Sequence, residues 1–479
     1  MEKKKKERRE RAEKEKKKLT ERFRKMGVVR FLSLGYLITI TIGTILLMLP
    51  FSTKDAAKVV INNVGDWFNL LLNTLLTATS ATCVTGLISF DTFDHWTMFG
   101  QIVIITLIQI GGLGFMTIIT LIFLIFRRKI NLFDRTVLMQ SAGSYTISGV
   151  MKLLTTVLLS TLVFEVLGAV ILTLRFKYGY NYETGKAIYY GIFHSISAFC
   201  NAGFDLFGGF SSLTNFVGDI VINLTIGALI LLGGTGFIVW LDIIESKFKW
   251  KNFELHTKLI LIFNLALVFI SMMFFLLFEY NSPSMKELNW FEKFVAALFM
   301  GITPRTAGFN TINLSILTPS SKFLTVILMF IGGCPGSTAG GVKLTTVIVV
   351  LFNLFTAAKG QDNIVILKRK ISSKLVKQSS ALFMAYLLLT LASTIFVCTI
   401  ESAFGNYIAF EDVLFEIVSA IGTVGLGMLQ VTSLSVFTRL LLIFLMYVGR
   451  IGAFTLFAVF FKEENNAIIQ VPEGNLLVG

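Results

Sequence analysis

The chain is predicted to be an all-α polytopic membrane protein assembled from four copies of one unit. Of its 479 residues, 54% are hydrophobic and only 15% are charged, which is too apolar for a single soluble core. Its apolar runs are long enough to cross a bilayer. Four short apolar stretches each end in a loop with one glycine after small or hydroxyl residues, and these glycines are 117, 105 and 117 residues apart. This spacing indicates an internal repeat.

Each repeat begins with a stretch of about 20 apolar residues, the length needed to span the hydrocarbon. These first spans are 31–50, 153–174, 259–278 and 381–400. A polar linker and a half-length apolar segment follow, and segments this short are typical of re-entrant helices. The half-length segments are 67–79, 187–198, 290–302 and 408–421.

The loop after each half-length segment leaves helical geometry inside the membrane, where unpaired backbone groups are costly. A water-filled path, in which carbonyl oxygens line the route of a cation, would explain four such loops. Glycine suits this role because alternating carbonyls often require a positive φ. A single glycine is more simply a helix terminator, but four in register favour an ion selectivity filter. Its predicted residues are Thr82, Cys83, Val84, Thr85, Gly86, Cys200, Asn201, Ala202, Gly203, Arg305, Thr306, Ala307, Gly308, Gly422, Thr423, Val424 and Gly425.

A second long span closes each repeat, at 100–126, 217–243, 323–355 and 436–461. Each carries a glycine motif that starts 25, 30, 24 and 24 residues after its loop glycine. Two motifs in the same order and at similar spacing predict four membrane span–pore helix–filter loop–span units around a pseudo-fourfold pore. The expected organisation is a basic cytoplasmic N-terminal tail followed by four pore units, the last with the C-terminal tail. The boundaries are 1–30, 31–135, 136–250, 251–370 and 371–479.

The second span of unit three departs from the others. As one helix its 33 residues would reach roughly 50 Å, whereas the hydrocarbon is ~30 Å thick. Its glycine-rich middle is poor helix, so we expect a broken helix whose middle lies under the filter as a gate. A phosphate-binding loop is disfavoured because no strand precedes the segment and the Gly-Lys-Ser/Thr end is missing. The predicted gate residues are Gly332, Gly333, Cys334, Pro335, Gly336, Ser337, Thr338, Ala339, Gly340, Gly341 and Arg450.

Arg450 replaces the second glycine of the repeat in unit four, inside an apolar span. A charge at the membrane centre costs at least ~2.5–3.5 kcal/mol unless it faces water or a partner. We therefore expect Arg450 to face the pore, where it opposes cation passage or pairs with a carbonyl of the unit-three loop. The alternative is an ion pair with Glu416 or Glu165. Both acids are predicted to be structural, bonded to backbone or hydroxyls, with a coupling-ion role as the alternative.

Positive charge gathers on one side of the predicted membrane. The net charge is +14, and residues 1–30 contribute 15 Lys or Arg and six Glu, a net +9. The loops between units are also basic, so the positive-inside rule places them and the N-terminus in the cytoplasm. The tail is interpreted as a juxtamembrane segment that attracts anionic membrane lipid. It is not interpreted as a signal peptide or as a nucleic-acid arm, because no nucleic-acid module follows it.

The sequence offers little for an enzyme or a resident metal. The four cysteines lie in predicted membrane regions, without CxxC pairs, and are interpreted as small packing residues rather than as disulfides or ligands. They are Cys83, Cys200, Cys334 and Cys398. Of the three histidines, His95 has Asp91 and Asp94 nearby, but no second His or Cys completes a ligand set. We expect neither enzymatic activity nor an organic cofactor.

In combination these motifs resemble the Trk/Ktr/HKT superfamily of potassium transporters, most closely the KtrB-type membrane subunits. The resemblance covers residues 30–479 and is carried by 80–87, 109–115, 303–310, 336–339, 448–452 and 471–474. It implies K⁺ passage down its gradient with K⁺ at the filter carbonyls, a homodimer with two separate pores, and a cytosolic RCK-type nucleotide-binding regulatory ring. Members with serine at the first filter glycine tend to pass Na⁺, so Gly86 implies K⁺.

The resemblance also identifies the loop 332–343 with the family gate and Arg450 with the arginine below the filter. Pro335 stands where neighbours usually have a small residue, which leaves the gating kinetics open. The predicted function is K⁺ uptake through a selective, gated channel-like pore in the cell membrane, controlled by a cytosolic subunit. A Na⁺- or H⁺-coupled potassium symporter is the alternative. It would need an ionisable relay inside the membrane, and the chain has few intramembrane acids.

Overall fold

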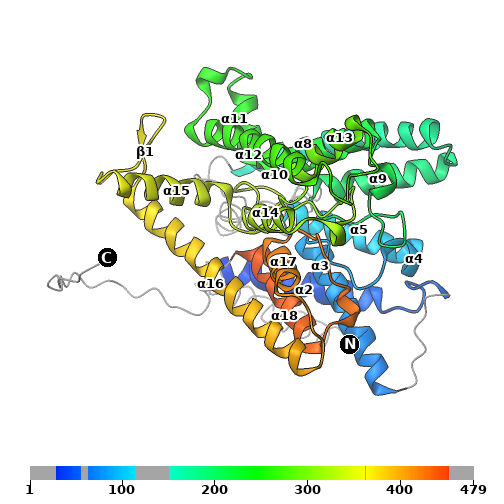
Figure 1. Ribbon diagram of the computed structural model, residues 1–479. Coiled ribbons are helices and arrows are strands. Elements are labelled where there is room, and N and C mark those ends of the chain that lie inside the picture. Colours follow the sequence, from blue (N-terminus) through cyan, green and yellow to red (C-terminus); the bar gives the residue numbers. More distant parts are fainter. Residues whose placement is uncertain (1–27, 56–62, 115–149, 362, 453–479) are drawn as a thin grey trace, which may run out of the picture.

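The computed structural model describes residues 28–55, 63–114, 150–361 and 363–452. Within these ranges the chain is almost entirely helical (Figure 1). Three described helices are individually long and apolar enough to cross a bilayer, namely α8 (Val150–Gly179), α12 (Leu255–Glu279) and α16 (Ser373–Ala403). The bent pair α10–α11 makes a fourth if it is counted as one span. Most of the predicted basic tail, the boundary at 135 and the last part of the second spans of units one and four lie outside the described residues.

Each predicted unit contains, in chain order, a helix in its first predicted span, a helix in its half-length segment and a helix or helices in its second predicted span. Unit one contains α2 (Val28–Leu47), α3 (Val64–Cys83), α4 (Thr92–His95) and α5 (Met98–Leu113). After α8, unit two continues with α9 (Thr184–Phe199), η2 (Thr214–Phe216), α10 (Ile220–Thr235) and α11 (Phe237–Glu245). Helix α3 is longer than the half-length segment predicted there, because it starts earlier and continues to Cys83.

Units three and four are arranged in the same way, with additions in unit three. Unit three has η3 (Trp250–Asn252), α12, α13 (Trp290–Ile302), η4 (Leu314–Ile316), α14 (Pro319–Phe330), α15 (Leu344–Ala358) and the antiparallel strands β1 (Val365–Ile366) and β2 (Arg369–Lys370). Unit four has α16, α17 (Phe410–Gly422), η5 (Val431–Ser433) and α18 (Val436–Ile451). The β1–β2 hairpin lies at one end of the helices, and α4 and the α8–α9 turn lie at the other (Figure 1).

Polar side chains start the second span of each unit. Thr97, Asp219, Thr318 and Ser435 each accept a hydrogen bond from an amide in the first turn of α5, α10, α14 and α18. In unit three Pro319 follows at the first helical position, where its missing N–H costs nothing. These caps satisfy donors that a helix end would otherwise leave unpaired.

The second span of unit three is broken, as predicted. Helix α14 ends at Phe330 and α15 begins at Leu344, with a non-helical segment between them. The second span predicted at 217–243 contains a bend of 87° between α10 and α11 at Gly236, which the sequence did not predict. There the amide of Phe237 donates to the carbonyl of Gly336 at 2.8 Å instead of continuing the helix. The segment that interrupts unit three thus also bends unit two.

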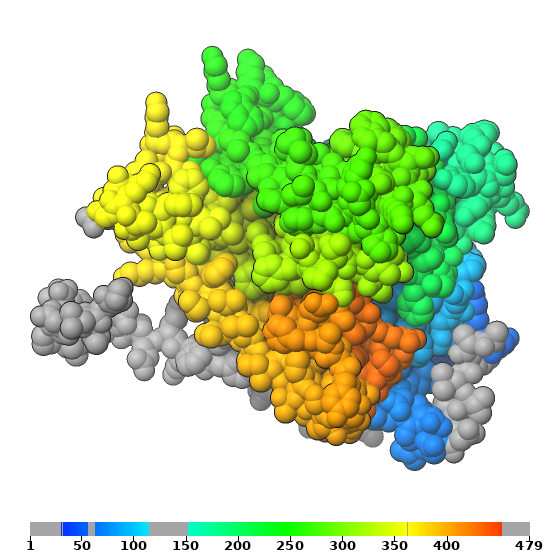
Figure 2. Space-filling model, viewed as in Figure 1, coloured from blue at the N-terminus to red at the C-terminus, as the bar shows by residue number. Residues whose placement is uncertain are grey.

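The buried core follows the C-terminal halves of the four short helices. Every residue of α3 from Leu76 to Cys83 is buried, and so is every residue of α17 from Phe415 to Gly422. In contrast, the long helices expose large apolar side chains, such as Leu167, Leu265 and Ile395 with 56%, 67% and 67% of their surface accessible. Apolar exposure of this extent is expected where helices face lipid. The space-filling view shows the described segments packed into one body (Figure 2).

Candidate functional site

The four predicted filter loops meet at one place. A Cβ atom built on Gly86 would lie 2.6 Å from the carbonyl oxygen of Ala202. The same relation holds between Gly203 and Ala307 at 2.9 Å, between Gly308 and Val424 at 2.6 Å, and between Gly425 and Thr85 at a shorter distance. These contacts run from unit one to two, two to three, three to four and four back to one. Four carbonyl oxygens therefore form a closed ring that any side chain at the glycines would disrupt.

The backbone of each loop alternates between ordinary and left-handed conformations. The glycines have φ values of 99°, 69°, 81° and 89° for Gly86, Gly203, Gly308 and Gly425. The predicted positive φ is therefore confirmed. The residue two positions earlier is also left-handed in every unit, namely Val84, Asn201, Thr306 and Thr423. Such a conformation is rare and strained for the β-branched residues among them, Val84, Thr306 and Thr423, and it was not predicted.

Backbone amides of the loops donate hydrogen bonds to carbonyls near the ends of the preceding short helices. The amides of Thr85, Ala202 and Val424 donate to the carbonyls of Ser80, Ser197 and Ser419 at 2.8, 2.8 and 2.9 Å. Because the amides point toward the helices, carbonyls are left free to point away from them. The C-terminal ends of the same helices, which carry partial negative charge, also face the loops.

Hydroxyl side chains near the ends of the short helices form further hydrogen bonds with the loops, which were not predicted. Ser80 Oγ accepts from the Gly86 amide at 2.9 Å, and Ser419 Oγ accepts from the Gly425 amide at 3.1 Å. Ser197 Oγ donates to the Phe204 carbonyl at 2.7 Å, and in unit three Thr303 donates to the Phe309 carbonyl. In units one, two and four a serine stands six residues before the filter glycine, and this repeated position could have indicated these hydrogen bonds.

Three predicted threonine hydroxyls lack partners. The Oγ1 atoms of Thr82, Thr85 and Thr423 are buried without a hydrogen bond among the described residues. Buried polar atoms in this state are costly, and a desolvated cation is one partner that would satisfy them. The fourth, Thr306 Oγ1, lies 3.2 Å from the side-chain amide of Asn201.

Other predicted filter side chains interact elsewhere. Arg305 Nη1 donates to the carbonyl of Asn264 on α12 at 3.1 Å. Cys200 Sγ lies 3.4 Å from Gln109 Oε1 on α5. These two side chains therefore fasten the loops to neighbouring helices. Cys83 is fully buried in the core.

The predicted gate segment lies directly against the filter loops. Thr338 Oγ1 donates to the carbonyl of Phe199, the last residue of α9, at 3.2 Å. A Cβ on Gly340 would collide with the hydroxyl of Thr423. The segment is tied to unit two by the bond from the Cys334 amide to the Gly234 carbonyl at 3.1 Å and to unit four by the bond from Gly341 to Gly449 at 3.3 Å.

The glycine motif of the second spans has a packing role that repeats. Gly111, Gly233 and Gly449 each face a carbonyl at the end of their own pore helix, those of Thr82, Phe199 and Ile421, with no room for a Cβ. In unit three Gly332 instead faces the carbonyl of Gly340 within the gate segment. Close approach of the backbones requires glycine at these positions. In unit three the backbone that approaches Gly332 is that of the gate segment itself.

Arg450 connects the gate segment to unit one. Its Nη1 donates to the carbonyl of Thr338, and its Nη2 donates to the carbonyls of Gly111 and, at 3.2 Å, Gly112. The predicted pairing with a carbonyl of the unit-three loop is confirmed. Within the described residues Arg450 forms no ion pair with either candidate acid.

The two candidate acids have partners of their own. Glu416 Oε2 accepts from the Met428 amide at 3.3 Å, which agrees with a structural role bonded to backbone. Glu165 Oε2 accepts from the side-chain amide of Gln109 at 3.1 Å rather than from backbone or a hydroxyl. The described residues contain no group of three or more His, Cys, Asp or Glu that could hold a metal ion.

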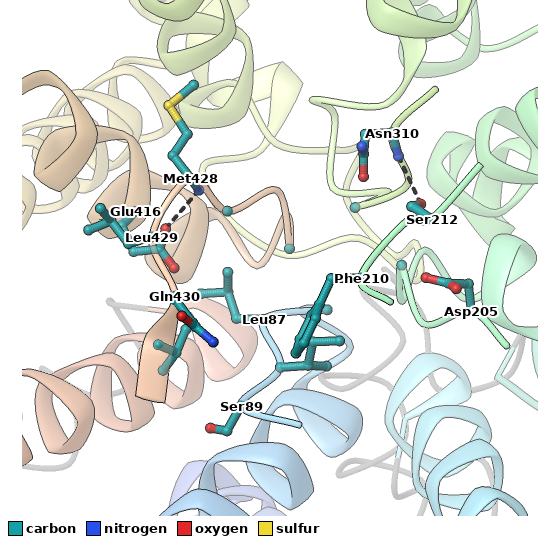
Figure 3. A pocket seen from close by; sticks show the side chains of 17 residues that line it. Leu87, Ser89, Asp205, Phe210, Ser212, Asn310, Glu416, Met428, Leu429 and Gln430 are labelled. Carbon is teal, nitrogen blue, oxygen red and sulfur yellow. Dashed lines mark hydrogen bonds between the residues drawn. The ribbon is translucent and has the colours of Figure 1, made fainter. Parts of the chain in front are cut away.

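A cavity of about 320 Å³ is lined by the filter glycines and by residues that follow them in the chain (Figure 3). All four filter glycines line it, together with Asp205 and Glu416. The pKa of Asp205 is raised to about 7, mainly by burial; the hydrogen bond from the Phe207 amide lowers it, and the nearby Asp91 and Asp94 carboxylates raise it. Asp205 was not predicted as a site residue, although no other unit has an acid two positions after its filter glycine. We name this cavity the vestibule.

Comparison with known proteins gives consistent matches. The family described as "TrkH: Cation transport protein" matches residues 37–470. Ktr system potassium uptake protein B of Bacillus subtilis is 37% identical over 92% of this chain and 94% of its own length. Potassium/sodium uptake protein NtpJ of Enterococcus hirae is 36% identical over 74% of this chain and 77% of its own. The crystal structure of the potassium transporter TrkH from Vibrio parahaemolyticus superimposes with a TM-score of 0.65, covering 89% of this chain and 84% of that one at 19% identity, which shows the shared fold.

Proposed function

Because the chain belongs to the TrkH family of cation transport proteins, a family of multi-pass membrane transporters and not of enzymes, we propose that it takes up K⁺ through a selective, gated pore. The observation that carries this proposal is the closed ring of four carbonyl oxygens, one from each filter loop. The names of the related potassium uptake proteins support the choice of ion. The pore is formed by four pseudo-fourfold units, as the cyclic order of the glycine contacts supports.

In this proposal the filter replaces the hydration shell of the ion. The ring carbonyls supply oxygens around a bare cation, and the unpartnered hydroxyls of Thr82, Thr85 and Thr423 supply more from the same loops. The C-terminal ends of α3, α9, α13 and α17 add negative potential. The left-handed residues and the serine ties hold these groups in place, so the protein spends little free energy on rearrangement when the ion arrives.

The gate segment and Arg450 control passage below the filter. The segment lies within contact of Phe199 and Thr423, where it obstructs an ion that leaves the ring. Arg450 anchors it and adds a positive charge that repels cations. Opening requires that the Arg450–Thr338 bond break and the glycine-rich segment move aside. We propose that the hairpin side of the molecule is cytoplasmic, because the hairpin carries Arg369 and Lys370 and the positive-inside rule assigns basic loops to the cytoplasm.

We further propose that the working form is a homodimer with one pore per chain. A cytosolic RCK-type ring, which binds nucleotides, controls the gate from the proposed cytoplasmic side. The basic loops there, including Lys249, Lys251 and Lys374, match the side that the positive-inside rule assigns to the cytoplasm. The exposed apolar faces of α8, α12 and α16 contact lipid.

A Na⁺-coupled symporter is the second candidate, favoured by one comparison. The relative from Enterococcus hirae is named a potassium/sodium uptake protein. Two buried acids, Glu165 and Glu416, are the groups that would carry coupling. Glu416 Oε1 has no hydrogen-bond partner among the described residues, so it is the first residue to test for coupling.

The experiment is cation flux into vesicles that contain the purified full-length chain. Rb⁺ uptake is measured under a K⁺ gradient, with Na⁺ and Li⁺ as competitors, with and without an added Na⁺ or proton gradient. Uptake driven by the K⁺ gradient and voltage alone supports the pore. Uptake that strictly requires a Na⁺ or proton gradient, and that Glu416→Gln abolishes, would reject the pore in favour of the symporter.

A further inference from the structure

A second cavity, of about 610 Å³, lies beside the β1–β2 hairpin and shares no lining residue with the vestibule. It is enclosed by the start of α12, by α15, by the hairpin and by the start of α16. One wall is apolar and consists of Leu255, Leu259, Ile348, Val349, Ile366, Ile371 and Leu375. Pro335 of the gate segment also lines the cavity, so an occupant would touch the segment proposed to block the pore.

The rim of this cavity is basic. Arg369 and Lys370 line it, are exposed, and form no side-chain hydrogen bond or ion pair that the described residues show. The hairpin that carries them is firmly placed, because Ile364 and Ile366 are buried and the Ile371 amide donates to the Ile364 carbonyl at 2.9 Å. The lining contains one acid, Glu254. Two cations that have no partner among the described residues, on an ordered hairpin, favour an anionic occupant.

The start of α12 adds to the positive potential at the same wall. Its N-cap residue, Glu254, makes no side-chain cap hydrogen bond, so amides of the first turn keep their capacity to donate. The N-terminal end of a helix carries partial positive charge and favours anions. His256, in the first turn, lines the cavity, and its Nε2 atom is buried without a hydrogen-bond partner among the described residues.

We propose that this cavity binds an anionic phospholipid, with its headgroup phosphate at Arg369, Lys370 and His256 and an acyl chain along the apolar wall. The proposal rests on the proposed function in one respect, since it needs the hairpin side to face the anionic cytoplasmic leaflet. The apolar wall distinguishes a lipid from a soluble phosphate compound, which would gain nothing from it. Further along the same helices Leu265 and Leu354 are 67% and 64% exposed, which continues the apolar wall toward lipid.

The hairpin projects beside the segment that leads into α12, on the same side of the molecule (Figures 1 and 2). A lipid held in this cavity contacts residues of units three and four, among them Pro335 of the gate segment. Occupancy therefore favours one position of the gate segment over another, and the lipid acts as a regulator rather than as a passive solvent. Regulation of this kind requires only that the lipid bind the two gate positions with different affinity.

The test compares lipid binding of purified full-length chains in detergent by native mass spectrometry, with phosphatidylglycerol against phosphatidylcholine. The double variant Arg369→Gln/Lys370→Gln is matched by Lys374→Gln/Lys377→Gln, which removes the same charge from exposed residues that do not line the cavity. Each basic residue near an anionic surface contributes ~1 kcal/mol, so the first variant should bind phosphatidylglycerol about 30-fold more weakly. The control should bind it like the wild type.

A second variant tests the apolar wall without changing charge. Val349→Trp fills the cavity and should also reduce phosphatidylglycerol binding. Three outcomes would overturn the proposal. The hairpin variant could bind phosphatidylglycerol as the wild type does, the control could lose as much binding as the hairpin variant, or inorganic phosphate alone could displace the lipid. A hairpin variant that still binds the lipid but no longer binds the regulatory subunit would also overturn the proposal, because the rim would then be a protein-docking surface.

Flux measurements separate this proposal from the proposed function. In phosphatidylcholine vesicles the wild type and both double variants should conduct K⁺ equally. Adding phosphatidylglycerol should change flux of the wild type and of the control, and not of the hairpin variant. A wild type that binds phosphatidylglycerol at the hairpin but carries no K⁺ in either vesicle would reject the proposed pore and leave the lipid site intact.

Discussion

Replacing Gly86 by serine tests the carbonyl ring most directly. Gly86 has a φ of 99°, and holding a residue with a side chain in such a region costs ~1–3 kcal/mol. The new Cβ would lie 2.6 Å from the Ala202 carbonyl oxygen, whereas real Cβ contacts essentially never fall under 3.0 Å. The carbonyl must therefore shift by at least about 0.4 Å, the difference between those two distances. If the ion-bound form bears this cost, K⁺ affinity falls about 5- to 150-fold.

The assay is competition between K⁺ and Na⁺ for Rb⁺ uptake into vesicles, which reports the ratio of the two affinities. Gly86→Ser should lower the K⁺ over Na⁺ preference by at least about fivefold, the lower limit of that range. The mutation should lower the affinity for K⁺ more than the affinity for Na⁺, because the ring carbonyls replace the hydration shell of K⁺. Unchanged preference in a folded variant would refute the assignment of these carbonyls to the filter.

Gly405→Ser is the matched control. Gly405 has a φ of 81°, and a Cβ there would meet no atom within 4 Å. It therefore carries the same kind of backbone strain without displacing a carbonyl. If Gly405→Ser reduced ion preference as much as Gly86→Ser, general destabilisation would explain both results.

Three further predictions concern the gate and the vestibule. Arg450→Ala removes the charge and the bonds to the gate segment, so basal Rb⁺ flux should rise about tenfold, equivalent to ~1.4 kcal/mol of barrier; unaltered flux would contradict the barrier role. Gly340→Ala places a Cβ against the Thr423 hydroxyl and should also raise basal flux, whereas Gly360→Ala, with φ 64° and open space, should not. Uptake at low K⁺ should fall as the external pH drops through about 7, where the Asp205 carboxylate becomes neutral. In Asp205→Asn uptake should be low at every pH, and a wild-type pH profile in this variant would assign the titration to another group.

The features that the sequence predicted correctly depend on local constraints. The positive φ of Gly86 and its three counterparts follows from the residue type, and the break after Phe330 follows from a span too long and too rich in glycine for one membrane helix. Left-handed Val84 could not be predicted, because a β-branched residue disfavours that conformation and only the surrounding ring enforces it. Asp205 was missed because its importance comes from burial and from neighbouring carboxylates on another unit.

The bend at Gly236 was missed for a different reason. The sequence of α10 and α11 is predominantly apolar and long enough to form one span. Its hydrogen bonds are diverted to Cys334, Gly336 and Thr338, about a hundred residues later in the chain. No local pattern in unit two indicates the bend. A glycine at the corresponding position also occurs in units one and four, as Gly114 and Gly452, with similar φ values of 85° and 94°.

The departures from the fourfold repeat are themselves informative, because they meet at one point. Unit three is broken by the gate segment, unit two bends where the Phe237 amide bonds to Gly336, and unit four places Arg450 against Thr338. Unit one keeps the regular glycine motif and offers the carbonyls of Gly111 and Gly112 to the same arginine. A filter benefits from four equivalent loops, since a cation is bound evenly by equivalent oxygens. A gate that inserts from one side needs one donor segment and different receiving surfaces on the other units. Mutations that restore the repeat, such as Arg450→Gly, should therefore leave ion preference intact while they weaken closure.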